Sequence, residues 1–141
     1  MRSFVIALLL AVAPAVAESP TPVVQLNAGM HLIRAEVVSD SGARAQGLMH
    51  RKALAQNAGM LFIFDEPSIH CMWMKNTLIP LSVAFIDERG PIVNIADMEP
   101  HSEASHCAAQ PVRYALEMNR GWFAAKGLKP GIRVGGIPGV K

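Results

Sequence analysis

Short runs of apolar residues, separated by turn-forming residues, extend along most of the chain. One of them, His31–Val38, alternates polar and apolar positions, which places Ile33, Ala35 and Val37 on the inner face of a half-buried strand. Continuous apolar runs elsewhere indicate buried strands. The complete set of predicted strands is Val23–Leu26, His31–Val38, Met60–Phe64, His70–Met74, Leu81–Asp87, Ile92–Ala96, Tyr114–Met118 and Ile132–Val134.

Two short helical segments interrupt this pattern. The first is predicted over Ala43–Met49, after a Ser-Asp-Ser sequence whose side chains can accept hydrogen bonds from the free amides of a first turn. Gly47 within it costs about 1 kcal/mol relative to alanine, which indicates either close packing or an early helix end. The second is a helical turn over Trp122–Lys126, ended by Gly127.

Strands of this length, with turn signals about every eight to twelve residues, indicate a mostly β fold. We therefore expect a compact single domain, a sandwich or open barrel of short strands with one or two short helices. The domain is predicted to span residues 23–134, between a mobile leader at 18–22 and a tail at 135–141.

The first 17 residues have the pattern of a secretory signal peptide. Arg2 precedes an apolar stretch, and the sequence Ala-Val-Ala at 15–17 supplies the small residues of a cleavage site. The apolar stretch is too short to span a membrane, which needs roughly 20 residues, and Pro14 interrupts it. We expect a cleaved signal peptide, a periplasmic or secreted location, and no stable membrane span after cleavage.

The charges of the chain are nearly balanced, with 13 lysines and arginines against 11 aspartates and glutamates. Loss of Arg2 with the signal peptide reduces the first number from 13 to 12, which leaves a net charge near +1. This balance gives no reason to expect a nucleic-acid partner. The sequence does not predict an oligomeric state.

Several motifs, in order along the chain, resemble those of the domain of unknown function 192 family. They are Arg44-x-x-Gly47-Leu48-Met49-x-Arg51, Gly59-Met60-Leu61-Phe62-x-Phe64, Trp73–Leu81, Phe85–Asp87, Val112–Glu117 and the Gly127…Gly131 step. The resemblance covers the chain from Val24 to Val134, with one departure at Ser82, where the family often has aspartate. It implies a compact, mostly β and frequently exported domain, without an established activity.

Cys71 and Cys107 are the two cysteines of the chain, and export would take them to an oxidising compartment. We therefore predict a disulfide bridge between them. In the chain-entropy treatment, closing a loop of this size stabilises the fold by about 3–4 kcal/mol. A metal or redox site is the alternative, although the sequence has no Cys-x-x-Cys pair of the thioredoxin type.

The polar step Lys75-Asn76-Thr77 follows Trp73 within otherwise apolar sequence. A cation, an amide, a hydroxyl and an aromatic face together suit a binding site for a small molecule, sugar or peptide. A structural interpretation has similar support, because Lys75 can pair with a carboxylate while Asn76 and Thr77 satisfy the backbone of a turn.

Glu117 interrupts an apolar strand and needs a cation, and apolar neighbours leave Lys75 little room to reach solvent. We therefore expect a buried Lys75–Glu117 pair, with Asp87 as the second candidate partner of Lys75. Arg44 has two open roles, a structural pair with a carboxylate or a binding group for an anionic ligand. The candidate ligand-binding residues are thus Arg44, Trp73, Lys75, Asn76, Thr77 and Glu117.

Two other functions compete with ligand binding. A hydrolase would need two facing carboxylates, and no catalytic sequence motif occurs; the candidates are Asp87, Asp97, Glu99 and Glu103. A copper protein would use thioether, thiolate and imidazole donors; the candidates are His70, Cys71, Met72, Met74, Met98, His101, His106 and Cys107. We favour an exported binding protein without a metal or cofactor.

Overall fold

The structure is a computed structural model, and it describes residues 11–15 and 20–140. Within these residues the chain forms nine strands and two short helices. In chain order they are β1 (Val23–Ala28), β2 (His31–Val38), α1 (Ser41–Gln46), β3 (Ala58–Ser68), β4 (Cys71–Met72), β5 (Leu81–Ile86), β6 (Ile92–Met98), β7 (His106–Cys107), β8 (Val112–Asn119), α2 (Trp122–Ala125) and β9 (Val134–Gly135).

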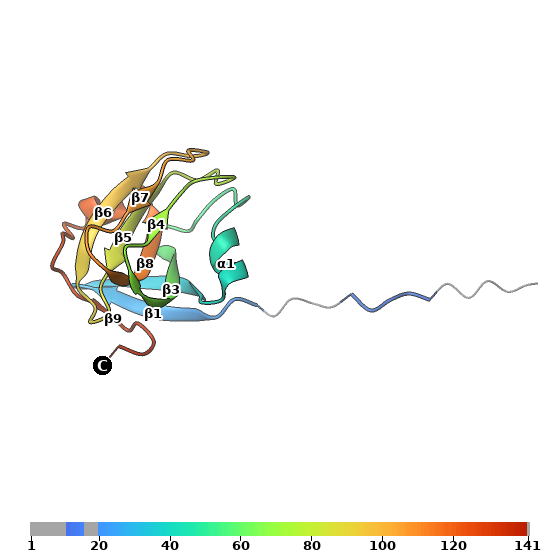
Figure 1. The fold of residues 1–141 in the computed structure, drawn as a ribbon, viewed down its shortest axis with the longest axis horizontal. Helices are drawn as coiled ribbons and strands as arrows, with labels where there is room; N and C mark the ends of the chain where they lie inside the picture. The colour runs from blue at the N-terminus through green and yellow to red at the C-terminus, as the bar shows by residue number, and fades with distance from the viewer. Residues whose placement is uncertain (1–10, 16–19, 141) are drawn as a thin grey trace, which may run out of the picture.

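Seven of these strands form one sheet in the order β6-β5-β8-β3-β2-β1-β9, and β4 and β7 form a separate pair. Neighbouring strands of the large sheet are antiparallel except β2 and β3. A parallel pair requires a crossover connection, and the segment that contains α1 provides it. The large sheet is curled into a half-barrel (Figure 1), which confirms the predicted mostly β single domain with two short helices.

The central strands bury side chains on both faces of the sheet, because successive residues of a strand point to opposite sides. On β3, Leu61 belongs to one apolar cluster, whereas Met60 and Phe62 belong to another. Phe123 of α2 packs in the first cluster, on what we call the α2 face. Ala43 of α1 packs against the second cluster, on the α1 face. Two-sided burial explains why these strands have continuous apolar sequences.

The strands on either side of residue 70 differ from the prediction. β3 continues past the expected turn at 65–67, because it pairs with β8 again at Ser68 after a bulge. The predicted strand at His70–Met74 is reduced to β4, which pairs with the two-residue β7. β7 lies inside the expected Glu99–Pro111 loop, where its two residues are too few to give a periodic pattern.

The helix α1 begins at Ser41, two residues before the predicted Ala43, and ends at Gln46, before the predicted Met49. Asp40 precedes it, and its carboxylate accepts a hydrogen bond from the Ala43 amide at 2.8 Å. Gly47 ends the helix with a positive φ of 48°, and a Cβ at this position would lie 3.2 Å from the Phe62 ring. Gly47 therefore provides both of the features that its position suggests, close packing and a helix end before Met49.

Two other strands show smaller differences. On β2, Ile33 and Ala35 are fully buried as expected, but Val37 is half-buried and Val38 is buried against the α1 face. The last strand, β9, is displaced by a short distance from the predicted Ile132–Val134. It pairs with β1 and forms the edge of the large sheet.

Most of the predicted signal peptide lies outside the described residues, which include 11–15 but not 1–10 or 16–19. The described part of that segment forms neither helix nor strand. Over the residues that the structure describes, no helix is long and apolar enough to cross a membrane.

Candidate functional site

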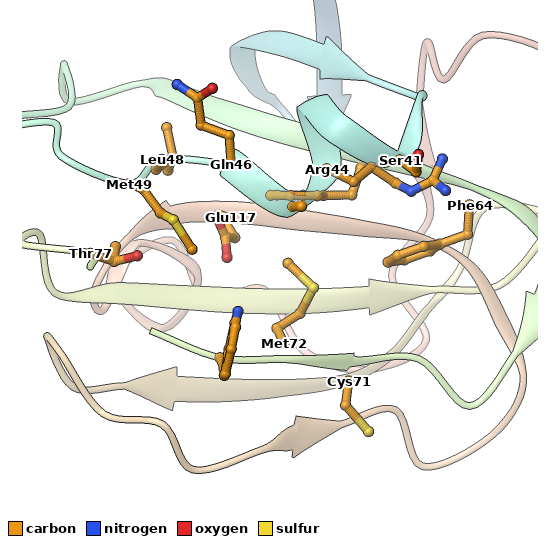
Figure 2. A pocket seen from close by; sticks show the side chains of 14 residues that line it. Ser41, Arg44, Gln46, Leu48, Met49, Phe64, Cys71, Met72, Thr77 and Glu117 are labelled. Carbon is orange, nitrogen blue, oxygen red and sulfur yellow. The ribbon is translucent and has the colours of Figure 1, made fainter. Parts of the chain in front are cut away.

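A cavity of about 300 Å³ lies on the α1 face, between α1 with the turn after it and the segment that begins with β4 (Figure 2). Its apolar walls are formed by Leu48, Met49, Phe62, Phe64, Met72 and Trp73. Its polar side chains belong to Ser41, Arg44, Gln46, Thr77 and Glu117. A mainly apolar surface with a few polar groups is typical of small-molecule sites.

Glu117 reaches the cavity because of the alternation of side chains along β8. Its neighbours Leu116 and Met118 belong to the α2-face cluster, so Glu117 projects from the opposite face. Within the sheet it is opposite Met60 on β3 and Val83 on β5. Both of these side chains are apolar and buried, and Glu117 itself is only 4% exposed.

In the part of the chain that the structure describes, no group neutralises the Glu117 carboxyl. Among the described residues, neither a hydrogen bond nor an ion pair reaches its oxygens. Figure 2 shows the carboxyl pointing into the space between Met49 and Met72. Burial therefore acts alone, and it raises the pKa of Glu117 from 4.5 to about 8. The carboxyl is largely protonated at neutral pH.

Arg44 contributes its stem rather than its charge to the cavity. Its guanidinium points away from Glu117, toward the end of the cavity beside Phe64 (Figure 2). There it donates to the carbonyl oxygens of Ser39 and of Ile63, the latter at 3.2 Å, and it pairs with Asp65 at 3.4 Å. The structural role of Arg44 is thus present, and both terminal nitrogens of its guanidinium have acceptors.

The aromatic wall beside Arg44 is held in place by stacking. The Phe64 ring lies 3.7 Å from the ring of His70, centroid to centroid, with the two planes nearly parallel. The guanidinium carbon of Arg44 lies 5.9 Å from the centre of the same Phe64 ring. These two contacts help to order the Phe64 side chain at this end of the cavity.

The predicted Lys75–Glu117 pair is wrong. Lys75 is exposed, and its ammonium lies 5.3 Å from the ring centre of Trp73 instead of near a carboxylate. The cause is a turn: the Thr77 amide donates to the Met74 carbonyl at 3.1 Å, and Asn76 at its corner has a positive φ of 53°. This turn directs Lys75 and Asn76 away from the cavity, and neither lines it.

Thr77 returns the chain to the cavity after this turn. Its side chain is 5% exposed, and its hydroxyl donates to the Lys75 carbonyl at 3.1 Å. Because the only hydroxyl proton is used inside the turn, the Thr77 oxygen can act toward the cavity only as an acceptor. In Figure 2, Thr77 lies on the side of Glu117 away from Arg44.

The predicted Cys71–Cys107 disulfide is confirmed, and it joins β4 to β7. Cys71 lines the cavity, and the next two residues, Met72 and Trp73, form the wall opposite α1. The bridge therefore fixes a segment whose strand pairing consists of only two residues.

The candidate carboxylates of a hydrolase and the candidate ligands of a copper site are engaged in other contacts. Among the turn carboxylates, Asp97 accepts a hydrogen bond from Ser82 at 2.6 Å, Asp87 accepts one from the Arg89 amide, and Glu99 pairs with Arg120. The disulfide occupies both thiols of the copper set, and Met74 and Met98 are fully buried in the apolar core. Within the described residues, no cluster of three His, Cys, Asp or Glu side chains could hold a metal.

Sequence reasoning placed Arg44, Trp73, Thr77 and Glu117 among its candidates, and all four line the cavity. It missed the contributions of the helix and of the turn after it, including Ser41, Gln46 and Met49. A signal was present for Met49 alone, because it belongs to the family motif from Arg44 to Arg51, in which position 46 is unspecified and which begins after Ser41.

The family departure at Ser82 does not affect this cavity. Ser82 lies between Leu81 and Val83, which both belong to the α1-face cluster, so it projects toward the α2 face. Its hydroxyl donates to Asp97 and accepts a hydrogen bond from the Gly121 amide at 2.9 Å. A carboxylate is thus present beside this position from β6.

The curled sheet and its cavity define a small single-domain β protein with a potential ligand site on one face. The chain belongs to the family of domain of unknown function 192, described as uncharacterised, whose family profile matches residues 23–136. No protein among those with curated descriptions matches the chain.

Two solved structures are similar to this one. The first is a protein from Sinorhizobium meliloti 1021, described as a candidate transcription regulator, with 39% identity and a TM-score of 0.79 over 85% of this chain and 98% of that one. The second is a protein of unknown function from Novosphingobium aromaticivorans DSM 12444, with 35% identity and a TM-score of 0.76 over 88% and 93%.

Proposed function

We propose that the protein binds a small molecule in the cavity on the α1 face. The observation that carries this proposal is Glu117, a buried carboxyl that faces the cavity and has no partner in the protein. A cavity volume of about 300 Å³ lies at the lower end of the range of ligand sites, roughly 300–1,000 Å³. A compact molecule, a single sugar ring or one side chain of a peptide would fill it.

The energetic argument starts from the cost of a buried polar group. Burial disfavours the charged form of the Glu117 carboxyl, as its raised pKa shows, and an apolar residue would fit better between Met60 and Val83. The carboxyl therefore reduces the stability of the empty protein. A ligand that supplies the missing partner recovers this cost, which favours a binding role for Glu117 over a structural role.

The location is part of the same proposal. The signal-peptide pattern of residues 1–17 and the Cys71–Cys107 disulfide both suit an oxidising compartment outside the cytoplasm. We therefore propose a periplasmic or secreted binding protein. A role in transcription, as in the description of the Sinorhizobium meliloti protein, has little support from a chain with 13 basic and 11 acidic residues.

Native mass spectrometry of protein purified from the periplasm of its own source tests this function. We expect a retained mass in the wild type and its loss in Met72→Trp, which fills the cavity, but not in Leu32→Trp on the exposed surface of β2. A fragment screen by NMR accompanies it, with shifts expected at Gln46 and Thr77. Absence of both a retained mass and cavity shifts would reject ligand binding.

A further inference from the structure

We infer that the ligand of this cavity is a small organic cation, an amine with an apolar group, whose ammonium binds the Glu117 carboxylate. This inference rests on the proposed function and adds the chemical class of the ligand. It begins with charge: Glu117 is the acidic group that lines the cavity, and Arg44 is the basic one. Because the Arg44 guanidinium is held by Asp65 and by two carbonyls, the negative charge that Glu117 acquires when it loses its proton is not compensated within the cavity.

The walls around Glu117 also favour a cation. Thioether groups of Met49 and Met72 lie on either side of the carboxyl (Figure 2), and the rings of Phe62, Phe64 and Trp73 complete the lining. Sulfur atoms and aromatic faces carry partial negative charge, so they attract cations while covering apolar groups. The indole of Trp73, which is 46% exposed, already has the Lys75 ammonium 5.3 Å from its centre.

Hydrogen-bonding groups in the cavity match an ammonium as well. An ammonium has up to three donors and no acceptor. The Glu117 carboxylate provides two acceptor oxygens, and the Thr77 hydroxyl has already used its proton on the Lys75 carbonyl. Both groups can therefore accept hydrogen bonds from a ligand ammonium, whereas an anionic ligand would find the Arg44 guanidinium already paired with Asp65.

Binding of a cation must be linked to release of the Glu117 proton. β3 and β5 present Met60 and Val83 to this carboxyl, and neither side chain titrates. From the other walls, Arg44 on α1 is paired with Asp65, and Cys71 on β4 is in a disulfide. Glu117 is thus the group that exchanges protons on binding, with a pKa of about 8 in the empty protein. The affinity should rise about tenfold per pH unit below this value and level off above it.

Titration calorimetry with matched probes tests the cation. The amines are ethylamine, cyclohexylamine and benzylamine hydrochlorides, and the neutral controls are ethanol, cyclohexanol and benzyl alcohol. At pH 8 we expect the best amine to bind at least about tenfold more tightly than its alcohol. Measurements in two buffers with different ionisation enthalpies should show release of about one proton at pH 6.5 and about half a proton at pH 8.

Two variants distinguish binding of a cation at Glu117 from binding of any small molecule in the cavity. Glu117→Gln should weaken the amine more than about tenfold, remove the proton release and leave the alcohol unchanged or tighter. The matched control is Glu99→Gln, which removes an exposed carboxylate paired with Arg120 outside the cavity and should not alter amine affinity. Thermal melts of both variants establish that they fold.

The outcomes distinguish the two levels of the proposal. Alcohols that shift Gln46 and Thr77 in NMR spectra and bind as tightly as the amines would overturn the cation but leave a small-molecule site. Amine binding that survives Glu117→Gln would also overturn the cation assignment. Failure of every amine and alcohol at millimolar concentration, together with no retained mass from the periplasm, would overturn both.

Discussion

The two faces of the curled sheet differ in how they treat buried polar groups. On the α2 face, the side chains of β8 pack beneath α2, where Phe123 is 1% exposed. The indole nitrogen of Trp122 is satisfied there by the Asn57 side chain at 3.1 Å. On the α1 face, Glu117 has apolar neighbours across the sheet and no partner. Leu116 and Glu117 are adjacent in sequence, yet they belong to these two different environments.

The α2 face of the sheet is covered by packed apolar side chains, whereas the α1 face contains the cavity that Glu117 lines. Packing on the α2 face continues through α2 to the last strand, β9, whose Val134 belongs to the same cluster. The α1 face ends instead at a cavity between α1 and β4. Buried polar groups are normally paired, so an unpaired one that borders an open cavity supports the proposed binding role.

The largest contrast between the two faces should appear when one aromatic side chain is removed from each. Phe123→Ala leaves a void on the closed α2 face and should lower the free energy of unfolding by about 3–5 kcal/mol. Trp73→Ala, at the partly exposed mouth of the cavity, should cost clearly less. Urea unfolding of both variants measures this contrast. Equal losses would contradict the distinction between a packed face and an open one.

The pH dependence of stability should be reversed from that of an ordinary carboxylate. The pKa of Glu117 is about 8 in the folded protein, which is higher than in the unfolded chain. The folded state therefore gains stability from binding this proton, and the gain is complete below pH 4.5. This contribution declines as the pH rises toward 8, by on the order of 4 kcal/mol between pH 5 and pH 8.

The comparison of wild type with Glu117→Gln isolates that effect from other titrating groups. The variant should gain stability relative to wild type as the pH rises through this window, and the difference should become constant above it. Urea unfolding at pH 5, 6, 7 and 8 measures the difference. A wild type that remained the more stable protein at pH 8 would show that the carboxyl has a partner.

Removal of the disulfide should loosen the cavity wall more than the rest of the fold. Cys71→Ser with Cys107→Ser should lower the free energy of unfolding by about 3 kcal/mol. Hydrogen exchange should then increase first around Met72, because the strand pairing of that wall consists of the two-residue β4–β7 pair. Uniform acceleration across the large sheet would argue against a separate role for the bridge.

The smallest effect is expected at the end of the cavity. Asp65→Asn weakens the pair with Arg44, but Asp65 is 84% exposed and Arg44 keeps its bonds to the Ser39 and Ile63 carbonyls. Stability should therefore change by less than about 1 kcal/mol, and amine affinity should be nearly unchanged. A large loss of amine binding would mean that Asp65, together with Glu117, defines the electrostatics of the site.

Much of the fold could be predicted from sequence because the strands carry their own patterns. The alternation in His31–Val38 and the apolar run of Leu81–Ile86 correspond to half-buried and doubly buried strands. The small β4–β7 pair could not be predicted, because two residues have no period and its pairing depends on a contact between distant segments. The parallel pairing of β2 with β3 could not be predicted either, because local sequence patterns do not show which strands pair.

The sequence predicted several residues of the site, but it did not predict which of them contact one another. An acidic residue inside an apolar strand singled out Glu117, but charge alone suggested the wrong partner, Lys75. The turn at Asn76 decides where that lysine points, and its positive φ is uncommon for a residue other than glycine. Met49 was overlooked because methionine in a short helical segment resembles ordinary core filling.

The titration of the Glu117 side-chain carboxyl carbon by NMR tests the central claim most directly. In the ligand-free protein, a buried carboxyl without a partner should titrate with a pKa of about 8. Saturation with the tightest amine should move this midpoint down, because the bound ammonium stabilises the carboxylate. A midpoint near the ordinary glutamate value of 4.5 in the free protein would contradict the unpartnered acid on which the binding site depends.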